Sequence, residues 1–260
     1  MSRKPKQTIL ISNDDGVEAP GLQALKQALQ PLGHIVTVAP DRPRSSCGHS
    51  VTLHKPLRIK KIVDGNGDIN HACTGTPADC VSLGIWVVCK KPPDLVVAGI
   101  NLGANMGSDV HYSGTIAAAR EAALQGIRSF AISVVAERDP CFKSAQIIAR
   151  GISEHLLSES CPSETLINVN VPNIMPDQLQ GIAISRCGFK RYVGGPEEHL
   201  DPSGQSYYWR GAEKPTMKPG SGTDVSAIRA RKVSITPLNL HAVTSNDTEW
   251  LQPLETNLLK

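Results

Sequence analysis

Residues 9–16, with the sequence Ile-Leu-Ile-Ser-Asn-Asp-Asp-Gly, constrain the fold more than any other stretch of the chain. The apolar run predicts a buried strand, and Asn13, Asp14 and Asp15 follow at its carboxyl end. Ligands of open α/β sheets bind outside the carboxyl ends of the strands, so these polar side chains are candidates for chemistry. Two neighbouring carboxylates repel each other, and a hard divalent cation relieves that repulsion. The alternative is a simple turn, because the same residues are common in turns.

The next residues predict a βαβ unit and hence a parallel sheet. Leucines recur at helical spacing from Leu22 to Leu32, Gly33 ends this helix, and residues 35–39 form a short buried strand. A strand, a helix and a strand so close together favour parallel strands with a right-handed crossover. The alternation continues with strands predicted at 93–99, 130–135 and 166–171, helices at 77–89, 116–125 and 143–157, and short strands or hairpin arms at 51–53, 57–59 and 70–73.

Two loops that follow predicted strands add polar side chains to the same edge of the sheet. Ser45 and Ser46 lie after the second strand, and either hydroxyl is a candidate metal ligand. Asn101 and Asn105 lie in a glycine-rich segment where backbone N–H groups can approach a ligand closely. That segment matches neither the P-loop nor the dinucleotide fingerprint. Ordinary solvated loops remain the alternative for both segments.

A third candidate group lies at the start of an alanine-rich helix. Ser113, Gly114 and Thr115 supply hydroxyls, free N–H groups and the positive end of the helix dipole, which together suit a phosphate. Asn13, beside the two aspartates, is a further candidate for phosphate contact. In the alternative interpretation, Ser113 is merely the N-cap of the helix.

Three predicted strand ends bring oxygen-rich side chains to one edge, where we expect a metal site: Asp14 and Asp15, Ser45, and Asn101 with Asn105. Carboxylate, hydroxyl and amide oxygens suit Mg²⁺ or Mn²⁺, whereas zinc is disfavoured because no His or Cys cluster accompanies them. A metal beside the helix entry would clamp a phosphoryl group, and metal-activated water is then the natural nucleophile. Asp14 and Asp15 are the candidate catalytic residues, and either one is a candidate base or nucleophile.

The pattern changes after Pro172, where the C-terminal part begins. Residues 182–186 alternate like an antiparallel strand. A glycine-bearing turn followed by aromatic residues at 194–211 predicts an exposed hairpin, which we expect to be an arm that packs on a second subunit.

The remaining C-terminal residues are expected to be less regular. Residues 214–223 are rich in Pro, Gly and Ser and are expected to be mobile. A helix should begin after Thr223, and a last strand at 233–238 should end at a sheet edge because of Pro237. The tail beyond Leu240 has at most a weak helical pattern.

Length and composition bound the organisation of the chain. We expect 260 residues to form a catalytic core at 1–180 and an extension at 181–260, whose last strand packs back on the core. A net charge of +3 with scattered Lys and Arg does not favour nucleic-acid binding. The apolar run near the start is too short for a secretion signal or a membrane span. Seven cysteines without a CxxC pair indicate reduced thiols in a cytoplasmic protein.

Several motifs in the same order resemble the SurE family of stationary-phase survival proteins, which act as 5'-nucleotidases. They lie at residues 13–16 and 19–21, 39–45, 75–81, 99–105, 112–115, 223–224 and 234–238. The resemblance implies a three-layer α/β/α Rossmann-like sheet with a swapped C-terminal hairpin arm, a homodimer or homotetramer, and one divalent metal ion per subunit. The chain departs from the family pattern at Ser203 in the arm, where Arg is usual, and at 230–232 before the last strand, where Gly-Tyr is usual.

The resemblance also implies a function and a set of site residues. The function is metal-dependent hydrolysis of nucleoside 5'-monophosphates to nucleoside and phosphate, with 3'-monophosphates and short polyphosphate as further candidate substrates. The implied metal ligands are Asp14, Asp15, Ser45 and Asn101, and the implied phosphate contacts are Asn105, Ser113, Gly114 and Thr115.

Two other classes of function stay open. The same pocket would serve a nucleotide-binding regulator without turnover, and the aromatic arm would serve an oligomeric scaffold. His49 and His111 flank the predicted site and are candidate proton shuttles, although histidines in loops are more often bystanders.

Overall fold

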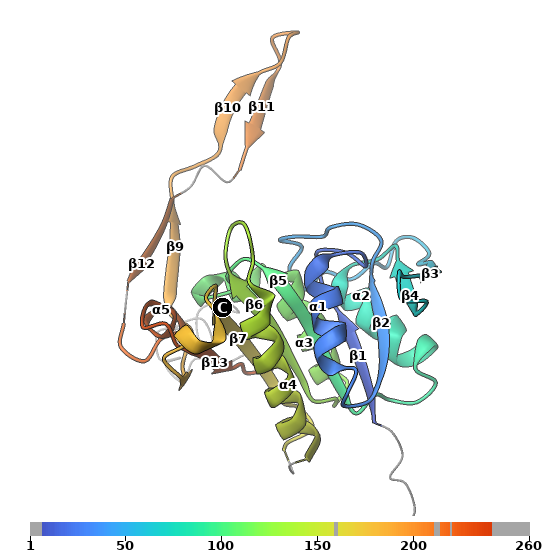
Figure 1. The fold of residues 1–260 in the computed structure, drawn as a ribbon. Helices are drawn as coiled ribbons and strands as arrows, with labels where there is room; N and C mark the ends of the chain where they lie inside the picture. Colours follow the sequence, from blue (N-terminus) through green and yellow to red (C-terminus); the bar gives the residue numbers. More distant parts are fainter. Residues whose placement is uncertain (1–6, 159–160, 211–213, 219, 241–260) are drawn as a thin grey trace, which may run out of the picture.

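A central sheet with helices on both faces forms the body of the molecule (Figure 1). The computed structural model describes residues 7–158, 161–210, 214–218 and 220–240. Within these residues the sheet has nine strands in the order β3-β4-β2-β1-β5-β6-β7-β13-β8. The parallel strands are β1 (Thr8–Ser12), β2 (His34–Pro40), β4 (Ile69–Cys73), β5 (Leu95–Leu102), β6 (Ser129–Val135) and β7 (Leu166–Pro172).

The two ends of the sheet depart from this parallel arrangement. At one end β3 (Ile59–Val63) pairs antiparallel with β4. At the other end β13 (Val233–Pro237) pairs antiparallel with β7, and β8 (Ile182–Ile184) pairs parallel with β13. The strand predicted at 182–186 therefore runs against the core strands, as expected, but its own neighbour is parallel to it.

Helices cover both faces, so the predicted three-layer α/β/α architecture is confirmed. One hydrophobic cluster joins α1 (Pro20–Leu29) and α4 (Phe142–Ser158) to one face of the sheet. A second cluster joins α2 (Pro77–Leu83), the π-helix η1 (Gly84–Val88) and α3 (Gly114–Leu124) to the other face. The helix predicted at 77–89 is thus an α-helix that continues as a π-helix.

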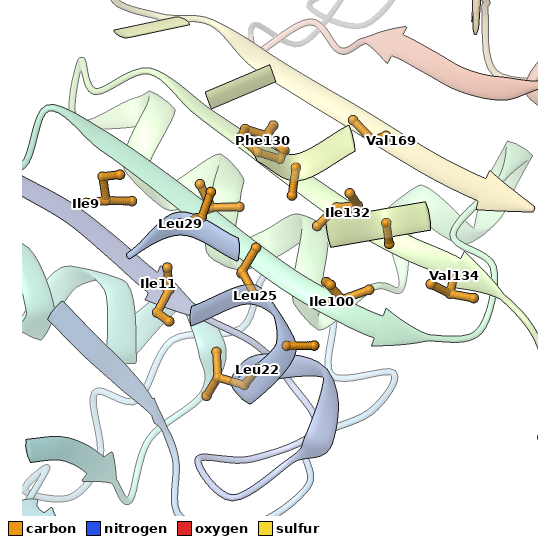
Figure 2. Packing of buried hydrophobic residues seen from close by; sticks show 14 of the residues in the cluster. Ile9, Ile11, Leu22, Leu25, Leu29, Ile100, Phe130, Ile132, Val134 and Val169 are labelled. Carbon is orange, nitrogen blue, oxygen red and sulfur yellow. The ribbon is translucent and has the colours of Figure 1, made fainter. Parts of the chain in front are cut away.

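The core is built from alternating strand residues packed against leucines of α1 (Figure 2). Ile9 and Ile11 of β1 face α1, whereas Leu10 belongs to the cluster on the opposite face. Phe130 and Ile132 of β6 lie in the same layer as Ile9 and are fully buried. Each such side chain contributes about 1.5–3 kcal/mol of transfer free energy when buried. This rigid layer fixes the strand ends at which the polar residues lie.

A two-part antiparallel ribbon projects away from the sheet (Figure 1). At its base β9 (Phe189–Val193) pairs with β12 (Lys214–Lys218), and beyond them β10 (Glu197–Leu200) pairs with β11 (Ser206–Trp209). We call residues 189–210 together with β12 the arm. The hairpin predicted within residues 194–211 is present, although Gly211 lies outside the described residues.

Two local predictions were wrong, and a third holds. Residues 214–218 form a strand rather than a mobile segment, because their backbone completes the ladder along β9. Residues 51–53 form no strand, because the N–H of Thr52 is bonded instead to the Asp79 carboxylate at 3.1 Å. The last strand lies between β7 and β8, but its end at Pro237 has β7 on one side only and is at an edge there, as predicted. Proline has no backbone N–H. It is tolerated at position 237 because β8 pairs only with Val233–Ile235, so no strand on that side lacks a hydrogen bond from residue 237.

Other predictions of local structure have a clear outcome. Thr76 caps α2, and its hydroxyl accepts the Asp79 N–H at 3.1 Å. All seven cysteines are free. No helix among the described residues is both long enough and apolar enough to cross a bilayer. The tail beyond Leu240 and the first six residues lie outside the description, and the division at residue 180 stays a prediction.

The two remaining elements near the site are short. A 3-10 helix, η2 (Gly107–His111), follows β5 and leads into α3. The helix α5 (Asp224–Arg229) begins after its N-cap Thr223, as predicted, and precedes β13.

Candidate active site

A cavity of about 540 Å³ opens at the carboxyl ends of β1 and β5. The structure brings all four predicted metal ligands to its lining, together with two of the predicted phosphate contacts: Asp14, Asp15, Ser45, Asn101, Asn105 and Ser113. These residues come from the loops after β1 and β2, from the end of β5 and the loop that follows it, and from the start of α3. The expectation that separate strand ends meet at one edge is therefore met, while the role of each side chain stays a prediction.

The two aspartates lie in an environment that disfavours two negative charges. Asp14 is 5% exposed, and burial raises its pKa to about 6. The hydroxyl of Thr115, which donates to Asp14 Oδ1, lowers this pKa, and the neighbouring charge of Asp15 raises it. Burial likewise raises the pKa of Asp15. A cation between the two carboxylates would remove this penalty.

Asn13 holds the turn that presents these aspartates. Its side-chain amide donates to the carbonyl oxygen of Gly16 at 2.9 Å, and its Oδ1 accepts the Gly16 N–H at 3.1 Å. Asn13 is fully buried and does not line the cavity. The predicted phosphate contact at Asn13 thus has no support in the geometry, because both ends of its amide serve the turn.

Gly114 and Thr115 lie behind Asp14 rather than on the cavity wall. A Cβ added to Gly114 would come within 2.8 Å of the Asp14 Cβ and within 3.1 Å of the Cys47 Sγ. Thr115 is fully buried, and its hydroxyl donates a hydrogen bond to Asp14 Oδ1. Neither residue lines the cavity, and both contact Asp14; their phosphate contact, through the N–H groups at the start of α3, stays a prediction.

The loop that carries Ser45 is tied directly to the aspartate turn. The N–H of Arg44 donates to the carbonyl oxygen of Asp14 at 2.7 Å. The Arg44 guanidinium donates to the carbonyl oxygen of Thr74 at 2.9 Å and does not line the cavity. Ser45 and Ser46 both line it. The backbone bond therefore fixes the distance between Ser45 and the acidic pair.

Asn101 follows an irregularity in β5 that aims its side chain. The register between β5 and β6 shifts between Ala98 and Asn101. Gly21 of α1 allows this, because a Cβ there would lie 1.9 Å from the carbonyl oxygen of Ile100. The Asn101 amide nitrogen donates to the Gly103 carbonyl oxygen at 2.8 Å, which leaves Oδ1 as its free ligand atom.

A buried network of polar side chains anchors Asn105. Its Nδ2 donates to the hydroxyl of Ser133 at 2.9 Å. Asn168 and Asn170 both donate to its carbonyl oxygen, at 2.7 and 3.0 Å. Sequence reasoning missed this network. The available signal was the pair of asparagines inside an otherwise apolar strand, which is unusual for a strand buried on both faces.

Ser113 serves as the N-cap of α3, as its alternative interpretation proposed. Its hydroxyl oxygen accepts the Ile116 N–H at 3.1 Å. The same residue lines the cavity, so the start of α3 also faces the site. The two interpretations of Ser113 are therefore compatible, because the hydroxyl proton stays available to a ligand.

The second wall of the cavity comes from η2 and the base of the arm. Lys190 pairs with the carboxylate of Asp109, and the Tyr192 hydroxyl donates to the same carboxylate at 2.7 Å. Burial works against the charge of Lys190, but its hydrogen bonds with Asp109 and Tyr192 raise its pKa above the ordinary value. Arg210 lines the same cavity. None of these was predicted as a site residue, because nothing in the sequence placed the arm base against the loop after β5.

One buried carboxylate fastens this wall in place. Asp224, at the first position of α5, is fully buried. Its Oδ2 accepts the Gly107 N–H at 2.7 Å, and its Oδ1 accepts the Gly188 N–H at 2.8 Å. The start of η2 and the start of β9 are thereby held together.

The two flanking histidines do not line this cavity. His49 Nε2 lies 3.0 Å from Glu121 Oε2, so it joins the Ser45 loop to α3. His111 lines a separate cavity of about 260 Å³ with Arg120. Their role as proton shuttles stays a prediction without geometric support.

The oxygen donors that meet here fit a hard divalent cation. The set offers two carboxylates, a hydroxyl and an oriented amide oxygen, which is the chemistry that Mg²⁺ and Mn²⁺ accept. Among the described residues, no group of three or more His, Cys, Asp or Glu side chains is arranged to hold a metal. A cation at this site would therefore need ligands from Ser45 and Asn101 as well as from the aspartates.

Comparison with known proteins assigns the family. The family model described as "Survival protein SurE" matches residues 9–194. This chain belongs to the SurE family. The match covers the strand ends, both polar loops and α3, so the SurE model includes every residue named in this subsection except Arg210 and Asp224.

SurE relatives match almost the whole chain. A protein of Pelobacter propionicus named 5'-nucleotidase SurE is 45% identical over 233 residues, which are 89% of this chain and 93% of the relative. One of Carboxydothermus hydrogenoformans with the same name is 42% identical over 258 residues, covering 95% and 97%. The crystal structure of the SurE protein from Aquifex aeolicus superimposes with a TM-score of 0.81 at 38% identity, covering 95% of this chain and 99% of that chain.

Proposed function

We propose that this protein is a 5'-nucleotidase that hydrolyses nucleoside 5'-monophosphates to nucleoside and phosphate. The observation that carries the proposal is the convergence of two buried carboxylates, a hydroxyl and an oriented amide on one cavity beside the start of α3. Relatives that match nearly the full length of the chain bear the name 5'-nucleotidase, which supports the same activity. We include 3'-monophosphates and short polyphosphate among the substrates to be tested.

The metal site of the proposal consists of Asp14, Asp15, Ser45 and Asn101, with one Mg²⁺ or Mn²⁺ ion per subunit. The donor set and the raised pKa values of the two aspartates favour such an ion. When bound, a divalent cation there supplies positive charge for the phosphoryl group and lowers the pKa of water.

The residues of the chain have separate tasks in the proposed reaction. Asn105 and Ser113, with the N–H groups at the start of α3, bind the phosphoryl oxygens. Asp14 or Asp15 accepts a proton from the attacking water, and this proton passes to the ribose oxygen as its bond to phosphorus breaks, so that the nucleoside leaves. The hydroxyl of Thr115 orients the Asp14 carboxylate, and the Asn13 turn fixes both acids.

The proposal extends to assembly and location. We infer a homodimer or homotetramer in which the arm contacts a second subunit, because the hairpin β10–β11 is exposed along its whole length. We place the protein in the cytoplasm on the basis of its free cysteines. Two alternatives stay testable, a nucleotide-binding regulator without turnover and an oligomeric scaffold.

The decisive experiment measures phosphate release from a panel of nucleoside monophosphates with Mg²⁺, Mn²⁺ or Co²⁺ and with chelator. We expect activity that requires a divalent cation and falls by at least about 100-fold in Asp14→Asn. Asp177→Asn, an exposed change on η3 (Pro176–Gln178), is the matched control and should keep wild-type activity. Undiminished metal-dependent turnover by Asp14→Asn would overturn the assignment. Binding of nucleotide without phosphate release would favour the regulator.

A further inference from the structure

The proposed chemistry leaves part of the cavity lining without a role. That part contains Asp109 of η2 with Lys190 and Tyr192 of β9, and we call these three residues the arm-base wall. Its side chains are interlocked. Lys190 pairs with Asp109, the Tyr192 hydroxyl donates to Asp109 at 2.7 Å, and the Lys190 ammonium lies 4.9 Å from the centre of the Tyr192 ring.

The arm-base wall is preorganised rather than loose. The side chains of Lys190 and Asp109 are only 15% and 13% exposed. Asp224 accepts hydrogen bonds from the N–H groups of Gly107 and Gly188. Gly107 is the first residue of η2, and Gly188 immediately precedes β9. A binding surface held in this way loses little conformational entropy when a ligand arrives.

The chemistry of the wall differs from that of the proposed phosphate contacts. Tyr192 is 42% exposed and Tyr112, on the same cavity, is 51% exposed, so aromatic surface is available there. The ammonium and the carboxylate beside it offer a donor and an acceptor. A nucleoside presents the matching groups, namely a flat aromatic base and ribose hydroxyls that both donate and accept. The cavity of about 540 Å³ falls within the usual range for small-molecule sites.

We propose that the arm-base wall is the nucleoside subsite, in which Asp109, Lys190 and Tyr192 recognise the leaving group of the phosphomonoester. This proposal rests on the proposed function and deepens it. It names the residues that bind the nucleoside part of the substrate, which the metal and phosphate residues do not contact. The wall distinguishes nucleotides from other phosphomonoesters. It also makes the base of the arm a part of the binding site.

The test compares two substrates that share a phosphate but differ in the leaving group. AMP carries a nucleoside, whereas p-nitrophenyl phosphate carries a small phenol. Two full-length variants remove one group each: Tyr192→Phe keeps the ring and loses the hydroxyl, and Lys190→Met keeps the stem and loses the ammonium. Lys143→Met, an exposed change on α4, is the matched control.

We expect each wall variant to lower kcat/KM for AMP about tenfold, mainly through a higher KM, and to change that for p-nitrophenyl phosphate less than about twofold. Binding calorimetry should give the same pattern, with weaker AMP binding and unchanged binding of inorganic phosphate. Equal losses on both substrates, or no loss on AMP, would refute the subsite and leave the wall as a structural anchor of the arm.

The calorimetric arm keeps this test independent of the proposed reaction. If the wild-type protein released no phosphate from any nucleotide, the 5'-nucleotidase assignment would fail. Selective weakening of AMP binding by Lys190→Met would still support the nucleoside subsite in that case, and equal binding by variant and wild type would refute it. A wild-type protein that binds phosphate but not AMP would refute it as well.

Discussion

Asn170 of β7 holds the backbone of Asn105 from both sides. Its Oδ1 accepts the Asn105 N–H at 2.9 Å, and its Nδ2 donates to the Asn105 carbonyl oxygen at 3.0 Å. Asn170 is fully buried and does not line the cavity. A residue in the interior of the sheet therefore sets the position of a residue on the cavity wall.

Replacing Asn170 should weaken phosphate binding as well as stability. In Asn170→Ala the buried N–H of Asn105 loses its acceptor, which costs about 1–3 kcal/mol of unfolding free energy. We also expect KM for AMP to rise more than kcat falls, because Asn105 loses its fixed place. Urea unfolding and steady-state kinetics measure both effects. Asn66→Ala, in an exposed turn, is the control, and a wild-type KM in Asn170→Ala would contradict the positioning role.

Gly114 and Gly151 provide a matched pair of glycine substitutions. A Cβ at Gly114 would lie 2.8 Å from that of Asp14, so Gly114→Ala should displace Asp14 and abolish most activity. A Cβ at Gly151, within α4, meets nothing within 4 Å. Gly151→Ala should therefore keep full activity and stabilise the protein by about 0.5–1 kcal/mol. Thermal unfolding and phosphate release test the pair, and an active Gly114→Ala would count against the tight fit.

The buried charge of Asp14 should cost stability when no cation is present. Because burial raises its pKa from 3.8 to about 6, the folded protein binds this proton more tightly than the unfolded chain does. The unfolding free energy therefore falls as pH rises through this interval, by roughly 3 kcal/mol, and the penalty persists at higher pH. We expect Asp14→Asn to be more stable than wild type at about pH 8 in chelator, and the difference to vanish below about pH 4.

Manganese provides the complementary measurement on the same two proteins. Mn²⁺ should raise the melting temperature of the wild type and leave that of Asp14→Asn nearly unchanged, because ligand binding to the folded state alone is stabilising. Equal stabilisation of both proteins would show that the cation binds elsewhere.

A separate ion pair should give the opposite pH dependence. The hydrogen bond from Lys26, at 2.6 Å, lowers the pKa of Asp64 to about 2. The pair therefore stabilises the fold above about pH 4, and this contribution is lost as pH falls toward about 2. Lys26→Met should destabilise the protein by about 1 kcal/mol at neutral pH, since it removes the cation that pairs with both Asp64 and Asp68. The difference should shrink in acid. Lys60→Met, exposed on β3, should behave like wild type throughout.

The apolar surface of the arm should hold subunits together. Leu200, Tyr208 and Trp209 are each more than 60% exposed on β10 and β11. A double variant with Tyr208→Ser and Trp209→Ser should have a lower mass of the assembly in sedimentation equilibrium, because burial of such apolar side chains drives association. Trp86→Ser, an equally exposed aromatic change on η1, is the control. An unchanged mass would remove the arm from the assembly.

The sequence was informative wherever the signal was local. Apolar runs, helical spacing and capping residues predicted the strands and helices that build the three layers, because each pattern reflects burial within one element. The parallel arrangement then placed Asp14, Ser45 and Asn101 at one edge without further information, since parallel strands share the edge at which they end.

What the sequence missed depends on contacts between distant segments. Lys190 meets Asp109 only because Asp224 joins β9 to η2, and no periodicity encodes that meeting. The strand β12 formed despite an irregular composition, because pairing with β9 outweighed local preference. Thr115 is a second example. The sequence pattern predicted that its hydroxyl would contact a phosphate, whereas in the structure the hydroxyl donates to the buried carboxylate of Asp14.

Asp224 couples the position of η2 to the position of β9. Its two oxygens are shared between the segment that leads toward α3 and the segment that rises into the arm, so neither can slide without stranding a buried carboxylate oxygen. The arm and the segment that leads to α3 are therefore joined at one buried carboxylate, beside the cavity that holds the two acids.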